Sequence, residues 1–264
     1  MQAAMSAEYL NKLFGFDGQV AVVIGGTGAL GGTLCEGLAQ AGAHVVVAGR
    51  SEERGNERVD AIKKLGCAAS FMAVDATSRE SVQALLDTLV KQHGRVHAAV
   101  NCAGVNSPTP IFDITEEEFN RIISGNLFAT LLGCQIFGKH MIDAGGGAIL
   151  NIGSVSSFRP LSRVYTYSAS KAAVLNLTRN VAREFAPKKV RVNCLCPGFF
   201  PAEQNRRILD PARVESILKH TPAGRLGDAP ELIGAALLLL SATAGSFING
   251  EAVYVDGGFT AMTI

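Results

Sequence analysis

Neither sign of charge dominates this sequence of 264 residues, which holds 24 Lys and Arg, 23 Asp and Glu, and a formal net charge of +1. Without a basic excess, the surface lacks the field that attracts the phosphate backbone of a nucleic acid. The composition argues against a nucleic-acid partner, and we expect a small-molecule substrate instead.

Long hydrophobic runs are also missing. The most apolar stretch, residues 232–240, is far too short to span a bilayer and is typical of a buried helix. Residues 1–17 lack the basic segment, apolar run and small-residue cleavage site of a secretory signal. We therefore expect no membrane partner and a cytoplasmic location, with residues 1–17 as an N-terminal extension.

Metal-ligand patterns are absent as well. The five histidines are scattered without metal-ligand spacing, and none of the six cysteines forms a C-x-x-C pair. Cys194 and Cys196 fall in an apolar run, where a strand would put both on one face. We predict no metal site. We also predict reduced, buried thiols at positions 35, 67, 102, 134, 194 and 196.

Apolar residues make up 48% of the chain, and strand-like runs alternate with helical segments along it. The expected strands are residues 19–24, 44–48, 68–74, 96–101, 148–152, 190–195 and 252–255. The expected helices are residues 30–41, 52–65, 78–93, 115–141, 164–185 and 230–240, and residues 199–228 are expected to be loop-rich. Such continuously apolar strands are typical of a parallel sheet covered on both faces. The sequence thus predicts a single α/β domain over residues 1–264, with a doubly wound, Rossmann-like parallel sheet in three αβα layers.

A glycine-rich turn joins the first expected strand to the first helix. It reads Gly25-Gly26-Thr27-Gly28-Ala29-Leu30-Gly31-Gly32, and Gly26, Gly28 and Gly31 match the G-x-G-x-x-G template in the context it requires. A side chain there would block a pyrophosphate, whose charge suits the free N–H groups of the helix N-terminus. We predict a dinucleotide site made by Gly25, Gly26, Thr27, Gly28, Leu30 and Gly31. A purely structural tight turn is the alternative.

The end of the second strand indicates which dinucleotide binds. An acid near that point usually meets a free ribose 2′-OH, but here the strand ends at Gly49-Arg50-Ser51. Arg50 can pair with a 2′-phosphate through two N–H bonds, which favours NADP, with NAD as the alternative. Asp75 and Ala76, at the end of the third strand, are expected near the adenine. The alternatives are a solvated Arg50 and an Asp75 that caps a helix.

Polar motifs follow the later strands, where the topology puts the edge of a bound cofactor. They are Asn101-Cys102-Ala103-Gly104, Gly153-Ser154-Val155-Ser156 and Pro197-Gly198. Tyr167 and Lys171 stand four residues apart, on one face of a helix. We predict that the cofactor meets Asn101, Ala103, Gly104, Tyr167, Lys171, Pro197 and Gly198.

With these motifs in this order, the chain resembles the short-chain dehydrogenases/reductases over essentially its whole length. The resemblance implies that Tyr167 is the general acid/base, and that Lys171 stabilises its phenolate and bonds the nicotinamide ribose. It implies that Ser154 hydrogen-bonds the substrate oxygen, and that Asn126, on a helix, holds a proton-relay water. Taken singly, each residue also has an ordinary structural explanation.

The glycine turn departs from the usual family pattern, T-G-x-x-x-G-x-G. Gly25 and Gly31 match it, but Ile24 replaces the Thr and Ala29 replaces the middle Gly. An alanine methyl is a small intrusion, so the departure bears on the phosphate contacts and not on the function.

Two segments bear on the substrate. Residues 158–163 lie between Ser154 and Tyr167, and residues 199–228 lie where family members carry a lid over the substrate. The candidate substrate-binding residues are Ser156, in the motif after the fifth strand, and Arg159, Arg163, Asn205, Arg206 and Arg207 in these segments, of which the arginines suit a carboxylate. These segments and the C-terminal residues 257–264 resemble sugar-acid dehydrogenases of the mannonate/fructuronate and gluconate type.

The sequence therefore predicts an NADP(H)-dependent oxidoreductase that interconverts a secondary alcohol and a ketone on a sugar acid. A 3-ketoacyl thioester reductase is the enzymatic alternative, although the near-neutral charge shows no basic patch for a carrier protein. A non-catalytic cofactor-sensing or scaffold protein is the alternative of another class. The resemblance also implies a homotetramer or homodimer, with the helices of residues 115–141 and 164–185 packing across a two-fold axis.

Overall fold

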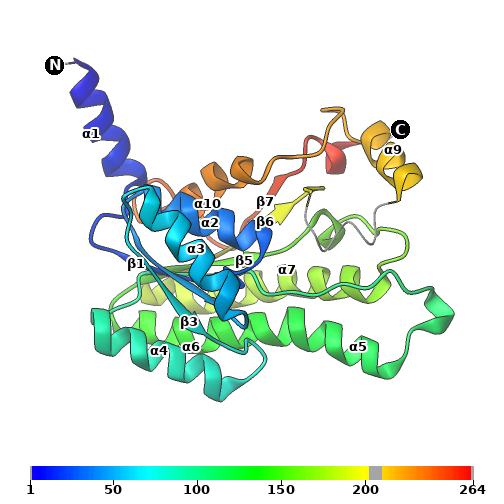
Figure 1. Ribbon diagram of the computed structural model, residues 1–264, viewed down its shortest axis with the longest axis horizontal. Helices are drawn as coiled ribbons and strands as arrows, with labels where there is room; N and C mark the ends of the chain where they lie inside the picture. Colours follow the sequence, from blue (N-terminus) through cyan, green and yellow to red (C-terminus); the bar gives the residue numbers. More distant parts are fainter. Residues whose placement is uncertain (1, 202–209, 263–264) are drawn as a thin grey trace.

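A computed structural model describes residues 2–201 and 210–262 of the chain. Its centre is a seven-stranded sheet in the order β3-β2-β1-β4-β5-β6-β7, in which all neighbouring strands are parallel (Figure 1). The strands are β1 (Val20–Ile24), β2 (His44–Gly49), β3 (Ala69–Ala73), β4 (Ala98–Asn101), β5 (Gly147–Ile152), β6 (Val190–Pro197) and β7 (Ala252–Val255). Each lies within or next to a segment predicted to be a strand.

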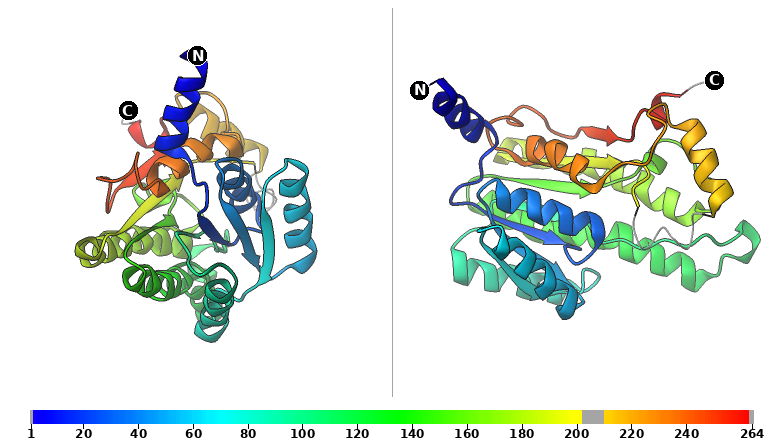
Figure 2. Two further views of the ribbon diagram at one scale, coloured as in Figure 1. Left: turned by 90° about the vertical axis from the view of Figure 1, so that its left-hand side faces the viewer. Right: turned by 45° about the horizontal axis from the view of Figure 1, so that its top comes forward.

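Helices cover both faces of this sheet (Figures 1 and 2). One face packs against α2 (Ala29–Gln40), α3 (Glu52–Lys64) and α10 (Ile233–Leu240). The other packs against α4 (Arg79–His93), α6 (Ala129–Asp143) and α7 (Tyr165–Phe185). The predicted three-layer, doubly wound fold is confirmed.

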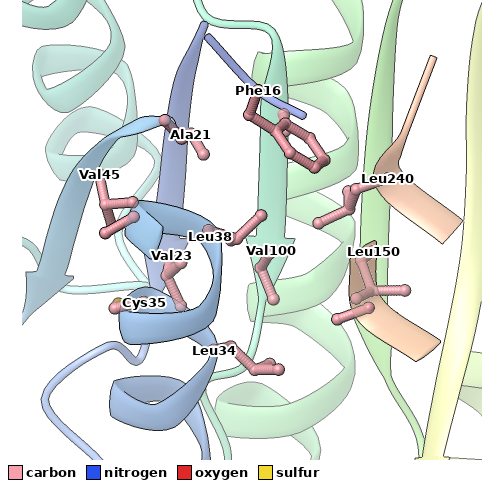
Figure 3. Packing of buried hydrophobic residues seen from close by; sticks show 14 of the residues in the cluster. Phe16, Ala21, Val23, Leu34, Cys35, Leu38, Val45, Val100, Leu150 and Leu240 are labelled. Atoms are coloured by element: carbon pink, nitrogen blue, oxygen red, sulfur yellow. The ribbon is translucent and has the colours of Figure 1, made fainter. Parts of the chain in front are cut away.

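Side chains of the central strands alternate between the two layers of the core. On β1, Ala21 and Val23 pack with Leu34 and Leu38 of α2 (Figure 3), whereas Val22 belongs to the cluster on the opposite face. Because both faces are buried, both sets of residues are apolar. This explains why the sequence shows continuous apolar runs instead of alternation.

The chain winds outward in one direction from β1 and in the other from β4, so the two strands form the switch point of the sheet. Ile24 at the end of β1 is in register with Asn101 at the end of β4, and the Cys102 N–H donates to the Ile24 carbonyl at 2.8 Å. Ligands of open α/β sheets bind in the crevice beyond such carboxyl ends. The glycine turn and the Asn101-Cys102-Ala103-Gly104 motif meet at this point.

The helix predicted for residues 115–141 is interrupted. It consists of α5 (Glu116–Ile123), a π-helical turn (Ser124–Phe128) and α6. A single-turn π bulge re-aims side chains within a helix and is frequent at functional sites. The sequence does not predict this π-helical turn, because the apolar pattern of the helix continues through it.

The described part of residues 199–228 is less loop-rich than predicted, since it contains α9 (Pro211–His220). The Asp210 side chain accepts a hydrogen bond from the Arg213 N–H at 2.8 Å, and Pro211 occupies the first helical position. Both are helix-start signals. Other prolines in this region favour a loop, so the sequence analysis did not recognise the two helix-start signals.

The N-terminal extension is helical, which the sequence analysis did not predict. Helix α1 (Gln2–Phe14) projects from one end of the molecule (Figures 1 and 2). Its Leu13 carbonyl accepts hydrogen bonds from the Ser241 hydroxyl and the Ala244 N–H, which tie it to the segment after α10.

The shorter helical turns are Ile111–Asp113, Val155–Ser157, Ala186–Lys188, Ala229–Leu232 and Phe259–Ala261. Across the described residues, no helix combines the length and the apolarity needed to cross a membrane. The same residues contain no group of three or more His, Cys, Asp and Glu that could hold a metal ion.

The six cysteines are all free. Cys35, Cys134, Cys194 and Cys196 are buried as predicted, whereas Cys67 and Cys102 are partly exposed. Burial of the Cys102 thiol still raises its pKa to about 11. The sulfurs of Cys194 and Cys196 lie 3.7 Å apart, as expected for one strand face.

Candidate active site

The glycine turn after β1 has room only for glycine at two positions. Gly25 has φ +92°, and a Cβ built on it would lie 2.7 Å from the Ala103 nitrogen. A Cβ on Gly31 would lie 2.3 Å from the Gly25 carbonyl oxygen. Close packing of the chain against itself therefore requires glycine at both positions, in a turn that leads into the N-terminus of α2, where free N–H groups suit a pyrophosphate.

The replacement of the usual middle glycine by Ala29 fits this turn. Ala29 is exposed at the first position of α2, and its neighbour Gly28 is the N-cap residue. A Cβ on Gly28 would itself meet only the Gly25 carbonyl oxygen, at 3.3 Å. The turn thus tolerates a methyl group at position 29.

The end of β2 brings Arg50 close to the same turn. A Cβ on the preceding Gly49 would lie 2.6 Å from the Thr27 hydroxyl, so Thr27 packs directly on the end of this strand. Arg50 is exposed, and Ser51 caps α3 by accepting a hydrogen bond from the Arg54 N–H at 3.3 Å. Arg50 is thus an exposed residue directly after the strand end on which Thr27 packs, and its charge acts on Asp75.

Asp75 follows β3 and is held in a local turn. Its Oδ1 accepts hydrogen bonds from the Thr77 hydroxyl at 2.7 Å and the Thr77 N–H at 2.9 Å. These bonds lower the pKa of Asp75, and the nearby Arg50 charge adds a smaller lowering. The cap of α4 is Ser78, not Asp75, so the helix-cap alternative is wrong. The neighbouring Ala76 packs against the core.

Tyr167 and Lys171 share one face of α7. The Lys171 side chain is buried, and its Nζ donates a hydrogen bond to the Ile152 carbonyl at the end of β5 at 2.7 Å. The same Nζ lies 5.7 Å from the centre of the Tyr167 ring. Tyr167 is half-buried. The predicted pair is thus brought together at the carboxyl edge of the sheet.

Ser154 opens a short helical turn directly after β5. Its Oγ accepts a hydrogen bond from the Ser156 N–H at 3.2 Å, and no described residue accepts a bond from its hydroxyl. The proton of this hydroxyl therefore remains for a ligand oxygen. Ser156 is also buried, and its Oγ has no hydrogen-bond partner in the described part of the chain.

Asn126 lies in the π-helical turn and is fully buried. Its amide exchanges two hydrogen bonds with the backbone of Val105, at 2.7 and 3.0 Å, and donates to the Ser170 hydroxyl at 2.9 Å. Its main-chain carbonyl accepts a hydrogen bond from the Thr130 hydroxyl at 2.7 Å. The bulge thus ties α7 to the loop after β4, and the water-holding role stays a prediction.

The segment from Asn101, the last residue of β4, to Gly104 has one part that packs into the protein and one part that faces the candidate site. The Asn101 side chain is 4% exposed and donates to the Asn151 amide oxygen at 2.8 Å, so it braces β4 against β5, and its Oδ1 has no hydrogen-bond partner among the described residues. A contact between Asn101 and the cofactor stays a prediction. Gly104 faces the site, since a Cβ on it would lie 3.7 Å from the Lys171 Nζ. Ala103 contacts the glycine turn, as described above.

After β6, Pro197 ends the strand and Gly198 passes close to the C-terminal turn. The Gly198 N–H donates to the Val255 carbonyl at 2.9 Å, and a Cβ on Gly198 would lie 2.7 Å from the Asp256 Cα. The close approach explains the glycine at this position.

Two predicted substrate residues have protein partners. Arg163, which has φ +67°, pairs with Asp210 at 2.9 Å, so its charge is already compensated. Arg159 lies 5.1 Å from the ring centre of Phe158, and its Nη2 makes only long contacts of 3.5 Å with the carbonyls of Thr260 and Met262. Of the two, Arg159 is the better placed for a ligand carboxylate. Asn205, Arg206 and Arg207 lie outside the described residues.

Two serines that contact the candidate site residues escaped the sequence analysis. Ser157 donates to the Lys171 carbonyl at 2.9 Å and accepts from the Ser154 N–H at 3.1 Å. Ser170 donates to the Tyr167 carbonyl at 2.7 Å and accepts from Asn126. The S-x-x-S spacing of residues 154–157, a capping-box pattern, was the available signal for Ser157.

The comparisons with known proteins agree with this geometry. A family model described as enoyl-(acyl carrier protein) reductase matches residues 27–260. Gluconate 5-dehydrogenase of Gluconobacter oxydans (strain 621H) is 34% identical over 249 residues, covering 94% of this chain and 97% of that protein. A 3-oxoacyl-[acyl-carrier-protein] reductase of Chlamydia muridarum is 32% identical, covering 91% and 96% of the two chains.

A solved structure has the same fold throughout. It is a gluconate 5-dehydrogenase from Burkholderia cenocepacia J2315 in complex with NADP and tartrate, 34% identical, with a TM-score of 0.92. The match covers 96% of this chain and 100% of that one. Together with the glycine turn, the Ser154 loop and the Tyr167–Lys171 pair, these matches confirm the predicted relationship. The chain belongs to the short-chain dehydrogenase/reductase family of NAD(P)-dependent oxidoreductases.

Proposed function

We propose that this chain is an NADP(H)-dependent oxidoreductase that interconverts a secondary alcohol and a ketone on a sugar acid. The main support for this proposal is the position of the Lys171 Nζ. It lies 2.7 Å from the Ile152 carbonyl and 5.7 Å from the centre of the Tyr167 ring. A fixed ammonium beside a phenol favours the phenolate, as a tyrosine acid/base requires.

The residues present fit a dinucleotide. A Cβ at Gly25 or Gly31 would collide with backbone, so glycines hold the tight turn that leads into the N-terminus of α2, a site suited to a pyrophosphate. Arg50, exposed beside Thr27, supplies the charge that a 2′-phosphate needs, which favours NADP over NAD. Gly104 lies near Lys171, so a nicotinamide ribose there would reach the ammonium.

The protein groups then handle the proton. When bound, NADPH supplies the hydride that adds to the carbonyl carbon. Tyr167 donates its phenolic proton to the oxygen of that carbonyl, on which negative charge develops. The Ser154 hydroxyl donates a hydrogen bond to the same oxygen, and Lys171 stabilises the phenolate left behind. In the oxidative direction Tyr167 takes the proton from the alcohol.

The sugar-acid substrate is supported by the relatives and by one side chain. The two gluconate 5-dehydrogenases match nearly the whole chain, and the one with a solved structure is in complex with tartrate, a hydroxy acid. Arg159, with only long contacts to the C-terminal carbonyls, is the proposed partner of the substrate carboxylate. Ser156 is proposed to contact the substrate, and residues 199–228 to cover it.

A substrate comparison tests the proposal. The purified protein is incubated with NADPH and, separately, with fructuronate, 5-ketogluconate and a β-ketoacyl thioester, while NADPH oxidation is followed. Turnover of a sugar acid is the expected result. Turnover of the thioester alone would remove the sugar-acid substrate and favour the 3-ketoacyl thioester reductase, to which the similarity with the Chlamydia muridarum protein also points. NADPH binding without any turnover would favour the non-catalytic alternative.

We further propose a cytoplasmic homotetramer or homodimer. The six free thiols suit a reducing compartment. Phe119 on α5 is 46% exposed and Phe128 at the end of the π turn is 42% exposed, so apolar surface is available where α5, α6 and α7 would pack across a two-fold axis. Size-exclusion chromatography with light scattering measures the mass of the protein in solution. The mass of a monomer would exclude the proposed homotetramer or homodimer.

A further inference from the structure

Two serine hydroxyls stand between pairs of residues in the candidate active site. The first, Ser157, closes the helical turn that Ser154 opens. Its Oγ accepts a hydrogen bond from the Ser154 N–H at 3.1 Å and donates one to the Lys171 carbonyl at 2.9 Å. Ser157 thus joins the loop that carries Ser154 to the helix that carries Lys171.

The second, Ser170, lies on α7 and is fully buried. Its Oγ accepts a hydrogen bond from the Asn126 amide at 2.9 Å and donates one to the Tyr167 carbonyl at 2.7 Å. Ser170 thus joins the π-helical turn to the part of α7 that carries Tyr167. Neither serine offers its hydroxyl proton to a substrate, because a main-chain carbonyl accepts it.

Both positions require one small group that donates and accepts at the same time. A serine hydroxyl has a single proton and lone pairs, and each of these two uses both. Alanine would remove both bonds and leave a main-chain or amide N–H without its acceptor, whereas threonine keeps the hydroxyl. The hydroxyls of Ser157 and Ser170 therefore fix the turn after β5 and the π-helical turn in position relative to α7.

We propose that Ser157 and Ser170 are positioning residues that set the distances between Ser154, Asn126 and the Tyr167–Lys171 pair. The inference rests on the proposed function of that site. Reacting groups must be held closely, and a misplacement of about 1 Å costs on the order of 100-fold in rate. Loss of either hydroxyl therefore lowers kcat, while the glycine turn stays intact and keeps most of the cofactor affinity.

The test compares Ser157→Ala and Ser157→Thr with wild type. We expect Ser157→Ala to lower kcat by about 10- to 100-fold, with KM and the NADPH dissociation constant within about twofold of wild type. Ser157→Thr is expected to recover most of the lost kcat, because it restores both hydrogen bonds. A general loss of structure would not produce this separation of kcat from KM or the rescue by threonine.

Ser241 offers a matched control. It is 2% exposed, and its hydroxyl also donates to a carbonyl, that of Leu13, and accepts backbone N–H groups, those of Thr243 and Ala244. It lies after α10 beside α1, away from the carboxyl ends of the strands. Ser241→Ala should lower the thermal unfolding midpoint as Ser157→Ala does, yet leave kcat at the wild-type value.

For the fully buried Ser170, Ser170→Cys fills the same space with a weaker donor and acceptor, so it is used beside Ser170→Ala in case the latter does not fold. Both should lower kcat while keeping most of the NADPH affinity. Wild-type kcat in Ser157→Ala or in a folded Ser170 variant would overturn the proposal, as would an equal loss of kcat in Ser241→Ala. Full turnover by Tyr167→Phe would instead reject the proposed function.

Discussion

The Nζ atom of Lys171 lies 5.7 Å from the centre of the Tyr167 ring. The two residues are one helical turn apart on α7, and the Ile152 carbonyl at the end of β5 fixes the ammonium at 2.7 Å. Because a strand end and a helix both anchor Lys171, its charge has one position relative to the sheet. A cofactor bound at the switch point would meet this fixed charge.

The glycine turn gives a direct prediction about cofactor binding. Gly31→Ala should abolish NADPH binding or weaken it severely, because the new Cβ would lie 2.3 Å from the Gly25 carbonyl oxygen and the turn must move. Gly234→Ala is the control, since it is an exposed helical position with nothing within 4 Å of the new Cβ. Titration of NADPH fluorescence measures both. Unchanged affinity in Gly31→Ala would show that the cofactor does not use this turn.

Arg50 should decide the preference between the two nicotinamide cofactors. Hydrogen bonds to charged groups contribute about 1.5–3 kcal/mol, so Arg50→Ala should weaken NADPH binding by about 10- to 100-fold. NADH affinity should change little, because NADH lacks the 2′-phosphate. Dissociation constants for both cofactors check this, and an equal effect on the two would assign Arg50 to some other role.

Much of this site could be predicted from the sequence, and the part that could not has physical causes. The seven strands, the glycine turn and the order of Ser154, Tyr167 and Lys171 follow from local patterns, because apolar runs and short motifs keep their spacing along the chain. Asn101 was assigned to the cofactor, and that contact stays a prediction, but the bond by which its side chain braces β4 against β5 was not foreseen. Which way a side chain at a strand end turns depends on its neighbours in space, and those are not adjacent in sequence.

The same limit explains the other differences. Arg163 was a candidate for the substrate, but its partner is Asp210, 47 residues away, at the start of a helix that the sequence analysis missed. The π turn at Asn126 and the bridging hydroxyls of Ser157 and Ser170 arise from contacts between elements. A single sequence gives the type of each residue there but not the contact.

Arg159 should act on substrates that carry a carboxylate. Arg159→Ala is expected to raise KM for a sugar acid by about 10-fold or more, since a charge-assisted bond is lost, and to change KM for an uncharged ketone little. Arg163→Ala is the matched control, because Arg163 is engaged with Asp210 and should affect both substrates alike. A larger KM effect from Arg163→Ala would reverse the assignment.

Two histidines at the opposite end of the sheet should make stability depend on pH. The His97 Nδ1 and the His140 Nε2 each accept a backbone N–H at 3.1 Å, from Val20 and Val96. Burial lowers the pKa of both, and the nearby Arg95 charge adds to it. The unfolded chain, with a histidine pKa of about 6.5, therefore takes up protons first as the pH falls.

The contribution of these histidines is thus complete above about pH 6.5 and is lost as the pH falls below it. Urea unfolding at about pH 7.5 and about pH 5.5 should show a lower free energy of unfolding at the acidic value. The double variant His97→Asn and His140→Gln keeps an acceptor at each place without titrating and should reduce this dependence, leaving the smaller part due to His44, whose pKa burial also lowers. A double variant as pH-sensitive as wild type would exclude these two residues as the cause.

The Tyr167→Phe variant tests the central claim most directly, because it removes one hydroxyl and keeps the ring that packs on α7. Turnover and NADPH affinity are measured on the same preparation. We predict that NADPH binds with wild-type affinity while kcat falls by about 10²–10⁴-fold, the usual contribution of general acid–base catalysis. Turnover within a few-fold of wild type would contradict the assignment of Tyr167 as the proton donor and acceptor.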